Sequence, residues 1–327
     1  GLAWDMSFMG ETASHARRAF FMIDLPHETT QESKVLKLTE AESLSASSKV
    51  LSGDISFDQY SMSYREETPL ILNDLSLTIP QGKKVGIIGS GISGLTLASL
   101  LQTNFNFEFI VYEKEEILNL DEGFGIQLSV NSVFILNKIG FNQLNKNEKY
   151  HPSKLDFYPI NCNKICDLDL SKFNSTNDKY TTLKRSILIK FLKEKLLSNS
   201  IIFRKEINDV EQINGKININ FIDGSNDRVD YLVVADGVFS NTKSVIEKKF
   251  FKPNYHGAVA IRTQIKTQDI SNLDSNNISL IMGSDAHLVL YPTNQQKEIN
   301  LVCIVRKKSE NDDSIKMILE NTILKEN

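Results

Sequence analysis

A glycine loop between a strand pattern and a helix pattern limits the folds that are open to this chain. Residues 85–88 form an apolar run, residues 89–94 hold the glycines, and the apolar residues of 95–101 recur at helical spacing. A second apolar run, residues 107–111, follows directly. This order predicts one βαβ unit of a parallel sheet, so we expect an α/β domain. Later in the chain, further strands are predicted over residues 201–207, 216–222, 229–235, 257–267, 278–282, 286–291 and 298–306.

Two kinds of phosphate-binding loop fit these glycines. In the pattern G-x-G-x-x-G, Gly89 makes a tight turn, Gly91 lets the backbone approach a pyrophosphate, and Gly94 lets the helix pack closely. Glu113 ends the next strand, 113 − 94 = 19 residues on, where a carboxylate can bind a ribose hydroxyl. In the alternative P-loop pattern, Leu95 replaces the lysine that binds phosphate. The residues favour a dinucleotide over ATP, and a glycine turn without ligand is the third interpretation.

Composition excludes several classes of protein. The 37 Lys and Arg residues against 41 Asp and Glu residues give a net charge of -4, so no strong field for nucleic acid is expected. The three cysteines (Cys162, Cys166 and Cys303) and the five histidines lack the spacing of a metal site. No stretch approaches the roughly 20 apolar residues that cross a bilayer. We expect a cytoplasmic protein without metal, for which peripheral membrane contact stays open.

The first 82 residues have a different character from the rest. Residues 11–22 predict a helix, and residues 28–48 are a polar run that reads as a linker. Apolar residues then alternate over 55–64 and 70–79, which predicts two half-buried strands. We therefore divide the chain into a helix and linker (1–50), a pair of strands (51–82) and an α/β region (83–327).

From Lys83 onward, four motifs in order resemble the class A FAD-dependent aromatic monooxygenases, which include salicylate hydroxylase and ubiquinone-biosynthesis hydroxylases. The motifs are residues 85–95 with 111–114, residues 123–128 (GFGIQL), residues 183–185 (LKR) and residues 231–240 (YLVVADGVFS). The resemblance implies a set of residues that bind the cofactor: Gly89, Gly91, Ser93, Gly94, Glu113, Lys114, Arg185, Asp236 and Gly237. It implies no catalytic side chain, because the flavin carries the chemistry.

The resemblance also implies a fold and a reaction. The expected fold is a doubly wound FAD- and NAD(P)-binding Rossmann-like sheet with an inserted mixed β-sheet substrate domain, at about residues 150–180 and 255–327. NAD(P)H would reduce the FAD, and O2 would then be used to hydroxylate a small aromatic substrate. The family's Gly-Asp-x-x-His motif is imitated by residues 283–287, but residues 288–291 and 300–305 predict strands there. We therefore expect the family's C-terminal part to be missing, and a flavin-binding module without turnover is an alternative.

Residues 54–89 resemble a second family, the nucleotide-binding domains of C-type ABC transporters. In that family an aromatic side chain stacks on adenine, and Tyr64 is the matching position. The P-loop lysine is missing, and neither an ABC signature nor a Walker B pattern follows. We therefore expect a fusion or chimera joined at residues 83–89, and an ATP-binding transporter fragment is the rival function.

Overall fold

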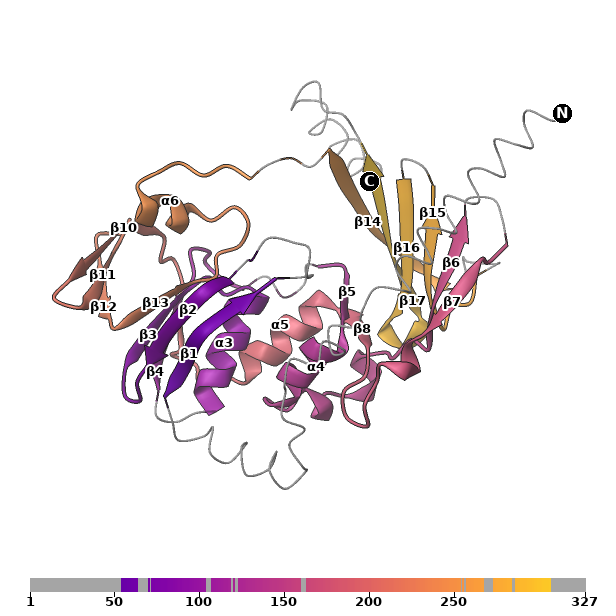
Figure 1. Ribbon diagram of the computed structural model, residues 1–327, viewed down its shortest axis with the longest axis horizontal. Helices are drawn as coiled ribbons and strands as arrows, with labels where there is room; N and C mark the ends of the chain where they lie inside the picture. The colour runs from indigo at the N-terminus through magenta and orange to yellow at the C-terminus, as the bar shows by residue number, and fades with distance from the viewer. Residues whose placement is uncertain are drawn as a thin grey trace. The chain divides into compact units, whose positions relative to one another are not determined.

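The computed structural model describes residues 54–63, 70, 72–103, 107–118, 120, 123–159, 163–253, 255, 257–267, 273–283 and 286–306 (Figure 1). These residues form two compact units. Unit 1 takes the described residues of Leu120–Leu188 and Asn254–Asn327, and unit 2 takes those of Glu32–Asn119 and Ile189–Pro253. The predicted helix at residues 11–22, the linker and Tyr64 lie outside the described residues.

A four-stranded parallel sheet is the centre of unit 2. Its strand order is β13 (Tyr231–Val234), β3 (Lys84–Ile88), β4 (Glu108–Tyr112) and β9 (Ile201–Ile202). Helix α3 (Ile92–Thr103) connects β3 to β4, so the predicted βαβ unit is confirmed. A short helix, α6 (Asn241–Glu247), follows β13.

Two apolar layers cover this parallel sheet. On one side, Val85 and Ile87 pack with Ala98 and Leu101 of α3. On the other side, Ile88 and Tyr112 pack with residues of a three-stranded antiparallel sheet. Its strands are β10 (Ile207–Ile213), β11 (Lys216–Phe221) and β12 (Asn226–Val229). Parallel strands need cover on both faces, which explains their nearly continuous apolar sequence.

Strands β1 (Ile55–Met62) and β2 (Leu72–Ile79) form an antiparallel hairpin in unit 2. The prediction that both strands are half-buried along their length is wrong, because Tyr60 is 44% exposed and Leu77 is 38% exposed. Irregular pairing around Tyr60 breaks the alternation of the two faces. Among the described residues of the hairpin, its base meets the α3-side core: Ile79 is buried there, and Ile55 packs against it.

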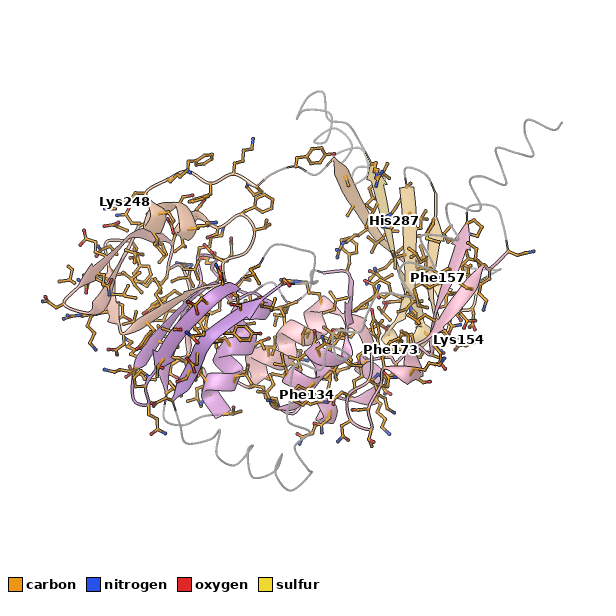
Figure 2. The ribbon with its side chains drawn as sticks, in the orientation of Figure 1. Phe134, Lys154, Phe157, Phe173, Lys248 and His287 are labelled. Atoms are coloured by element: carbon orange, nitrogen blue, oxygen red, sulfur yellow. The ribbon has the colours of Figure 1, made fainter. Side chains whose placement is uncertain are left out.

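Unit 1 is built on a six-stranded mixed sheet. Its strand order is β14 (Ala258–Lys266), β17 (Glu298–Arg306), β16 (Ala286–Thr293), β15 (Ile278–Met282), β6 (Lys154–Pro159) and β7 (Cys166–Asp169). Only the β15–β6 pair is parallel. Phe157, labelled in Figure 2, is fully buried and packs in one core cluster with Met282. The expected mixed sheet is therefore present.

A smaller β-ribbon and two helices complete unit 1. The ribbon pairs β5 (Gly125–Leu128) with β8 (Thr181–Lys184). Helix α4 (Val130–Asn137) follows β5, and α5 (Arg185–Glu194) begins in unit 1 directly after β8. Short 3-10 turns lie at Phe141–Gln143, Lys146–Glu148, Leu170–Lys172 and Asn294–Gln296.

Two predicted strands are wrong in their extent. The strand predicted over residues 201–207 is two strands, because Arg204 lies between them with φ 58° and leaves the extended region. The strand predicted over residues 229–235 is divided at Asp230, where β12 ends and β13 begins. Among the described residues, no helix has both the length and the apolar character needed to cross a membrane.

Candidate dinucleotide site

The glycine loop of unit 2 makes the close contacts that its pattern predicts. Gly89 has φ 98°, and a Cβ there would lie 2.7 Å from the carbonyl oxygen of Ala235. A Cβ on Gly94 would overlap the carbonyl oxygen of Gly89. A Cβ on Gly91, by contrast, would meet no atom within 4 Å. Gly89 and Gly94 thus serve the turn and its packing, whereas Gly91 borders open space.

A cavity of about 200 Å³ lies beside this loop, at the carboxyl ends of β3, β4 and β13. Open α/β sheets bind ligands at this edge. Most of the residues that the sequence nominates for the cofactor line the cavity: Gly89, Gly91, Glu113, Lys114, Asp236 and Gly237. Ser93 and Gly94 belong to the first turn of α3 and do not line it. Arg185 belongs to unit 1.

Glu113 is held by the glycine loop itself. Its Oε2 accepts hydrogen bonds from the Ser90 backbone N, at 2.8 Å, and from the Ser90 hydroxyl. Its Oε1 accepts from the Glu115 backbone N at 3.0 Å. Burial alone would raise the pKa of Glu113, but these hydrogen bonds outweigh it and hold the pKa below its ordinary value. Glu113 is therefore an ionised acceptor that joins the loop to the end of β4.

Asp236 has an acceptor atom for which the described residues supply no donor. Its Oδ2 accepts from the Thr242 backbone N at 3.4 Å, a long hydrogen bond. Its Oδ1 is buried and has no hydrogen-bond partner among the described residues. An unpaired buried carboxylate oxygen is costly, and a ligand hydroxyl at this point would satisfy it. Gly91 and Asp236 together fit a hydroxyl-rich dinucleotide.

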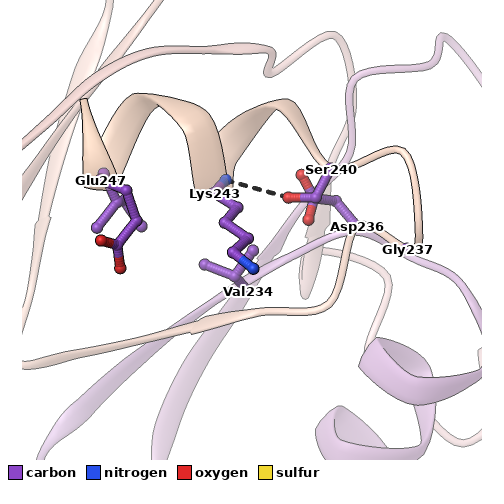
Figure 3. A pocket seen from close by; sticks show the side chains of 7 residues that line it. Val234, Asp236, Gly237, Ser240, Lys243 and Glu247 are labelled. Atoms are coloured by element: carbon purple, nitrogen blue, oxygen red, sulfur yellow. Dashed lines mark hydrogen bonds between the residues drawn. The ribbon is translucent and has the colours of Figure 1, made fainter. Parts of the chain in front are cut away.

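A second cavity, of about 310 Å³, adjoins the same turn (Figure 3). It shares Asp236 and Gly237 with the first cavity, and its other lining residues are Val234, Ser240, Lys243, Ile246 and Glu247. The Ser240 hydroxyl caps α6 by accepting from the Lys243 backbone N at 3.1 Å. The Asp236–Gly237 turn therefore forms part of the wall of both cavities.

Sequence reasoning missed several polar residues that line the first cavity: Ser90, Tyr112, Lys205, Glu206, Asn241 and Thr242. Ser90 occupies a variable position of the glycine pattern, so its hydrogen bonds to Glu113 left no signature. Thr242 meets Asp236 through its backbone, which no residue type could reveal. One local feature could have pointed to Thr242 as a site residue: it lies in the first turn of a helix that follows an Asp-Gly turn.

The position that would carry a P-loop lysine is inside the core. Leu95 is fully buried at the start of α3, and it is absent from the cavity lining. Leu95 therefore supplies no positive charge to a phosphate, and its side chain does not reach the cavity. This geometry favours the dinucleotide pattern over the ATP pattern.

In unit 1, Arg185 begins α5 directly after β8. Its backbone N donates to the carbonyl oxygen of Phe124 at 3.0 Å. Gly123 has φ 132°, and a Cβ there would lie 3.1 Å from the Arg185 Cβ, so a larger residue would be strained at this position. The GFGIQL segment and the LKR segment, which are far apart in the sequence, therefore meet at Arg185.

Residues 283–287 are not expected to be the family's Gly-Asp-x-x-His motif, because strands are predicted at residues 288–291 and 300–305. The structure has strands at both places. β15 ends at Met282, and β16 starts at Ala286 and pairs with it in the antiparallel sense. Gly283 donates its backbone N to the Ala286 carbonyl oxygen at 2.8 Å. The segment links two strands of a hairpin and does not lead from a strand into a helix.

Comparison with known proteins gives one family model and two groups of relatives. Residues 87–119 match the model of an NAD(P)-binding Rossmann-like domain. Salicylate hydroxylase of Pseudomonas putida is 24% identical over 245 residues, which are 70% of this chain and 56% of that protein. The 3-amino-4-hydroxybenzoate 2-monooxygenase of Streptomyces platensis is 23% identical over 68% of this chain and 56% of its own length. The chain thus spans little more than half the length of these relatives.

The second group consists of short matches to ABC transporters. The ATP-binding cassette transporter abc2 of Schizosaccharomyces pombe is 53% identical over 49 residues, which are 14% of this chain and 3% of that protein. These matches support a resemblance limited to a small segment. The hydroxylase matches cover far more of the chain.

Solved structures show the fold. HpxO of Klebsiella pneumoniae, complexed with FAD and uric acid, matches with a TM-score of 0.61 at 17% identity, over 70% of this chain and 58% of that chain. A salicylate hydroxylase substrate complex matches with a TM-score of 0.58 at 20% identity, over 70% and 57% of the two chains. The chain therefore has the Rossmann-like fold of FAD-dependent aromatic hydroxylases, and its relatives over about two thirds of its length are enzymes of that class.

Proposed function

We propose that this chain binds FAD and is derived from an enzyme that hydroxylates an aromatic ring with NAD(P)H and O2. The observation that carries the proposal is the cavity of unit 2, where open space at Gly91 faces the ends of parallel strands and Asp236 keeps an unpaired buried oxygen. In the balanced reaction, NAD(P)H, a proton, O2 and the ring give NAD(P)⁺, water and the hydroxylated ring. Bound flavin would supply the redox chemistry.

The residues of unit 2 are assigned to the adenosine and pyrophosphate half of FAD. Gly89 makes the tight turn, and its backbone N donates to the Tyr112 carbonyl oxygen at 2.8 Å, so the Gly91 backbone amide is the one assigned to the pyrophosphate. Ser93 and Gly94 support the loop from the first turn of α3. Glu113 accepts from a ribose hydroxyl, and Lys114 adds a positive charge beside the phosphates. Asp236 accepts from a further hydroxyl of the ligand at the turn that it forms with Gly237.

The remaining assignments rest on resemblance to the relatives. We assign Arg185 to the flavin half of the cofactor. The six-stranded sheet of unit 1 is assigned to the aromatic substrate, and residues 83–327 are assigned to the flavoprotein part of the chain. Residues 1–50 and 51–82 are assigned to the segment derived from a transporter, and the protein is assigned to the cytoplasm. None of these residues needs to act as an acid or base, because the protein binds and orients the cofactor and substrate and excludes water.

A ligand titration of the whole chain tests the proposal. Protein purified without added cofactor is scanned from about 300 to 550 nm for bound flavin. FAD, ADP and ATP are then titrated separately and followed by fluorescence. We expect saturable binding of FAD that is tighter than binding of ADP, with no comparable binding of ATP. ATP binding without FAD binding would favour the transporter fragment, and FAD binding without turnover of NAD(P)H would reduce the function to a flavin-binding module.

A further inference from the structure

The backbone of Gly125 is held by side chains in place of a neighbouring strand. In the described structure, β5 pairs only with β8, so the other edge of β5 must find other partners. The Gly125 backbone N donates to Asn300 Oδ1 at 2.6 Å. The Tyr291 hydroxyl donates to the Gly125 carbonyl oxygen at 2.6 Å. We call Tyr291 and Asn300 the Gly125 clamp.

The sheet register and the glycine make this clamp tight. Tyr291 on β16 and Asn300 on β17 are directly paired, so both side chains project from the same face. A Cβ on Gly125 would lie 2.8 Å from the Asn300 Cβ and 2.9 Å from Thr293 Cγ2. The ribbon therefore approaches the six-stranded sheet as closely as it does only because residue 125 has no side chain.

The clamp is part of a buried polar seam between the ribbon and the sheet. Asn300 and Thr293 are fully buried, and Tyr291 is 3% exposed. Further along the seam, the Thr182 hydroxyl donates to the Pro292 carbonyl oxygen, and Lys184 forms an ion pair with Glu298 at 2.6 Å. Asn300 Nδ2 has no hydrogen-bond partner among the described residues, and the Lys184–Glu298 pair is partly exposed. The buried hydrogen bonds at Gly125 and Pro292 are costly to break, so they favour one arrangement of the elements that they join.

The clamp keeps one protonation state. A tyrosine hydroxyl is already protonated at physiological pH, and burial raises the pKa of Tyr291 further, to about 12, so the hydroxyl remains a donor. Asn300 does not titrate. The hydrogen bonds of the clamp therefore do not depend on pH in the physiological range.

The clamped glycine lies beside the residues assigned to the flavin. Gly123 packs against the Arg185 side chain, and the Phe124 carbonyl oxygen accepts from the Arg185 backbone N at 3.0 Å. We propose that Tyr291 and Asn300 are positioning residues that, by holding Gly125, fix residues 123–125 and Arg185 for the flavin half of FAD. This inference rests on the proposed function, since it concerns the same cofactor.

Tyr291→Phe and Asn300→Ala test the inference, with Tyr150→Phe as the matched control. The Tyr150 hydroxyl also makes hydrogen bonds within unit 1, to Gln296 and the Asn276 carbonyl oxygen, but none to Gly125. Affinities for FAD and for ADP are measured well below the unfolding temperature of each variant. The visible spectrum of bound FAD is recorded as a report on the ring environment.

We expect each clamp variant to weaken FAD binding by about tenfold and to alter the flavin spectrum, while ADP affinity stays within about twofold. Tyr150→Phe should change neither affinity. Equal losses of FAD and ADP affinity would show a purely structural role and overturn the inference. An unchanged FAD affinity and spectrum would overturn it as well, whereas a wild-type chain that binds no FAD would overturn the proposed function together with it.

Discussion

The two sheets of this protein keep their polar groups in different places. In the parallel sheet of unit 2, buried strand residues such as Val85, Ile87 and Val111 are apolar, and the polar contacts gather in the loops at the strand ends. In the six-stranded sheet of unit 1, the strands themselves bury Asp156, Ser279 and Asn300. In unit 2, the polar residues lie at the edge of the sheet, where a ligand can reach them. In unit 1, buried polar side chains hold the packing of the sheet itself.

This difference predicts what a substitution disturbs in each unit. A polar change at the loops of unit 2 should alter ligand affinity and leave the fold intact. A polar change within the strands of unit 1 should alter stability first, because a buried polar group without its partner is costly. The following variants test this contrast.

Gly91→Asp should give the largest effect. A side chain at this position meets no protein atom, so the fold should survive, but a carboxylate would stand against the phosphates. We expect FAD affinity to fall by more than about a hundredfold, with an unchanged unfolding temperature. Gly91→Asn, which has the same size without the charge, should lose less. Unchanged FAD affinity in Gly91→Asp would remove the loop from the cofactor site.

Asp156→Ala should destabilise unit 1 by about 3 kcal/mol. Asp156 is 1% exposed, and it accepts from Asn277 Nδ2 at 2.9 Å and from Lys164 Nζ at 3.3 Å. Asp167 binds the same lysine at the surface, so Asp167→Ala is the control and should cost less than about 1 kcal/mol. Urea denaturation followed by circular dichroism measures both. Equal costs would mean that burial of Asp156 is unimportant.

Ile79→Ala tests whether the hairpin belongs to the core of unit 2. Ile79 is 8% exposed within the α3-side core, so truncation should lower the free energy of unfolding by about 2 to 3 kcal/mol. Leu77, on the same strand but 38% exposed, should lose less than about 1 kcal/mol when changed to alanine. A mild effect at both positions would mean that the hairpin is not anchored to the sheet.

Glu113→Ala should weaken FAD binding by about 1 to 3 kcal/mol, the scale of a lost hydrogen bond to a charged group. Ser90→Ala separates the two roles of this carboxylate, since it removes only the hydroxyl contact within the loop. We expect Ser90→Ala to have the smaller effect on FAD affinity, measured by fluorescence titration. If the two variants lose the same affinity, Glu113 acts by holding the loop and does not touch the ribose.

The smallest effect concerns pH. Because hydrogen bonds hold the pKa of Glu113 below its ordinary value, the unfolded chain takes up this proton first as the pH falls. The contribution of the carboxylate is complete above the unfolded pKa of about 4.3, and it is lost as the pH falls through the folded value. We expect this contribution to stay below about 1 kcal/mol, because the carboxylate is partly exposed and water screens it. The free energy of unfolding of wild type and of Glu113→Gln, compared from neutral to acid pH, measures this contribution. We expect the difference between the two proteins to shrink toward acid pH, and a difference that grows would contradict the lowered pKa.

Local patterns were sufficient for part of this protein. The strand, glycine loop and helix of residues 85–101 follow from apolar spacing and from the steric freedom of glycine, which act within a few residues. The same holds for the strands at residues 278–282 and 298–306, whose predicted bounds match the structure. The absence of a lysine at Leu95 was also visible in the sequence alone.

Tertiary structure alone decided which residues meet and which are buried. Gly125 and Asn300 are separated by 175 residues, and their hydrogen bond depends on strand register in two different sheets. The exposure of the hairpin depends on irregular pairing that apolar alternation does not encode. The unpaired oxygen of Asp236 depends on where α6 places the Thr242 backbone. A sequence pattern specifies local backbone geometry, whereas contacts between distant segments arise only when the whole chain has packed.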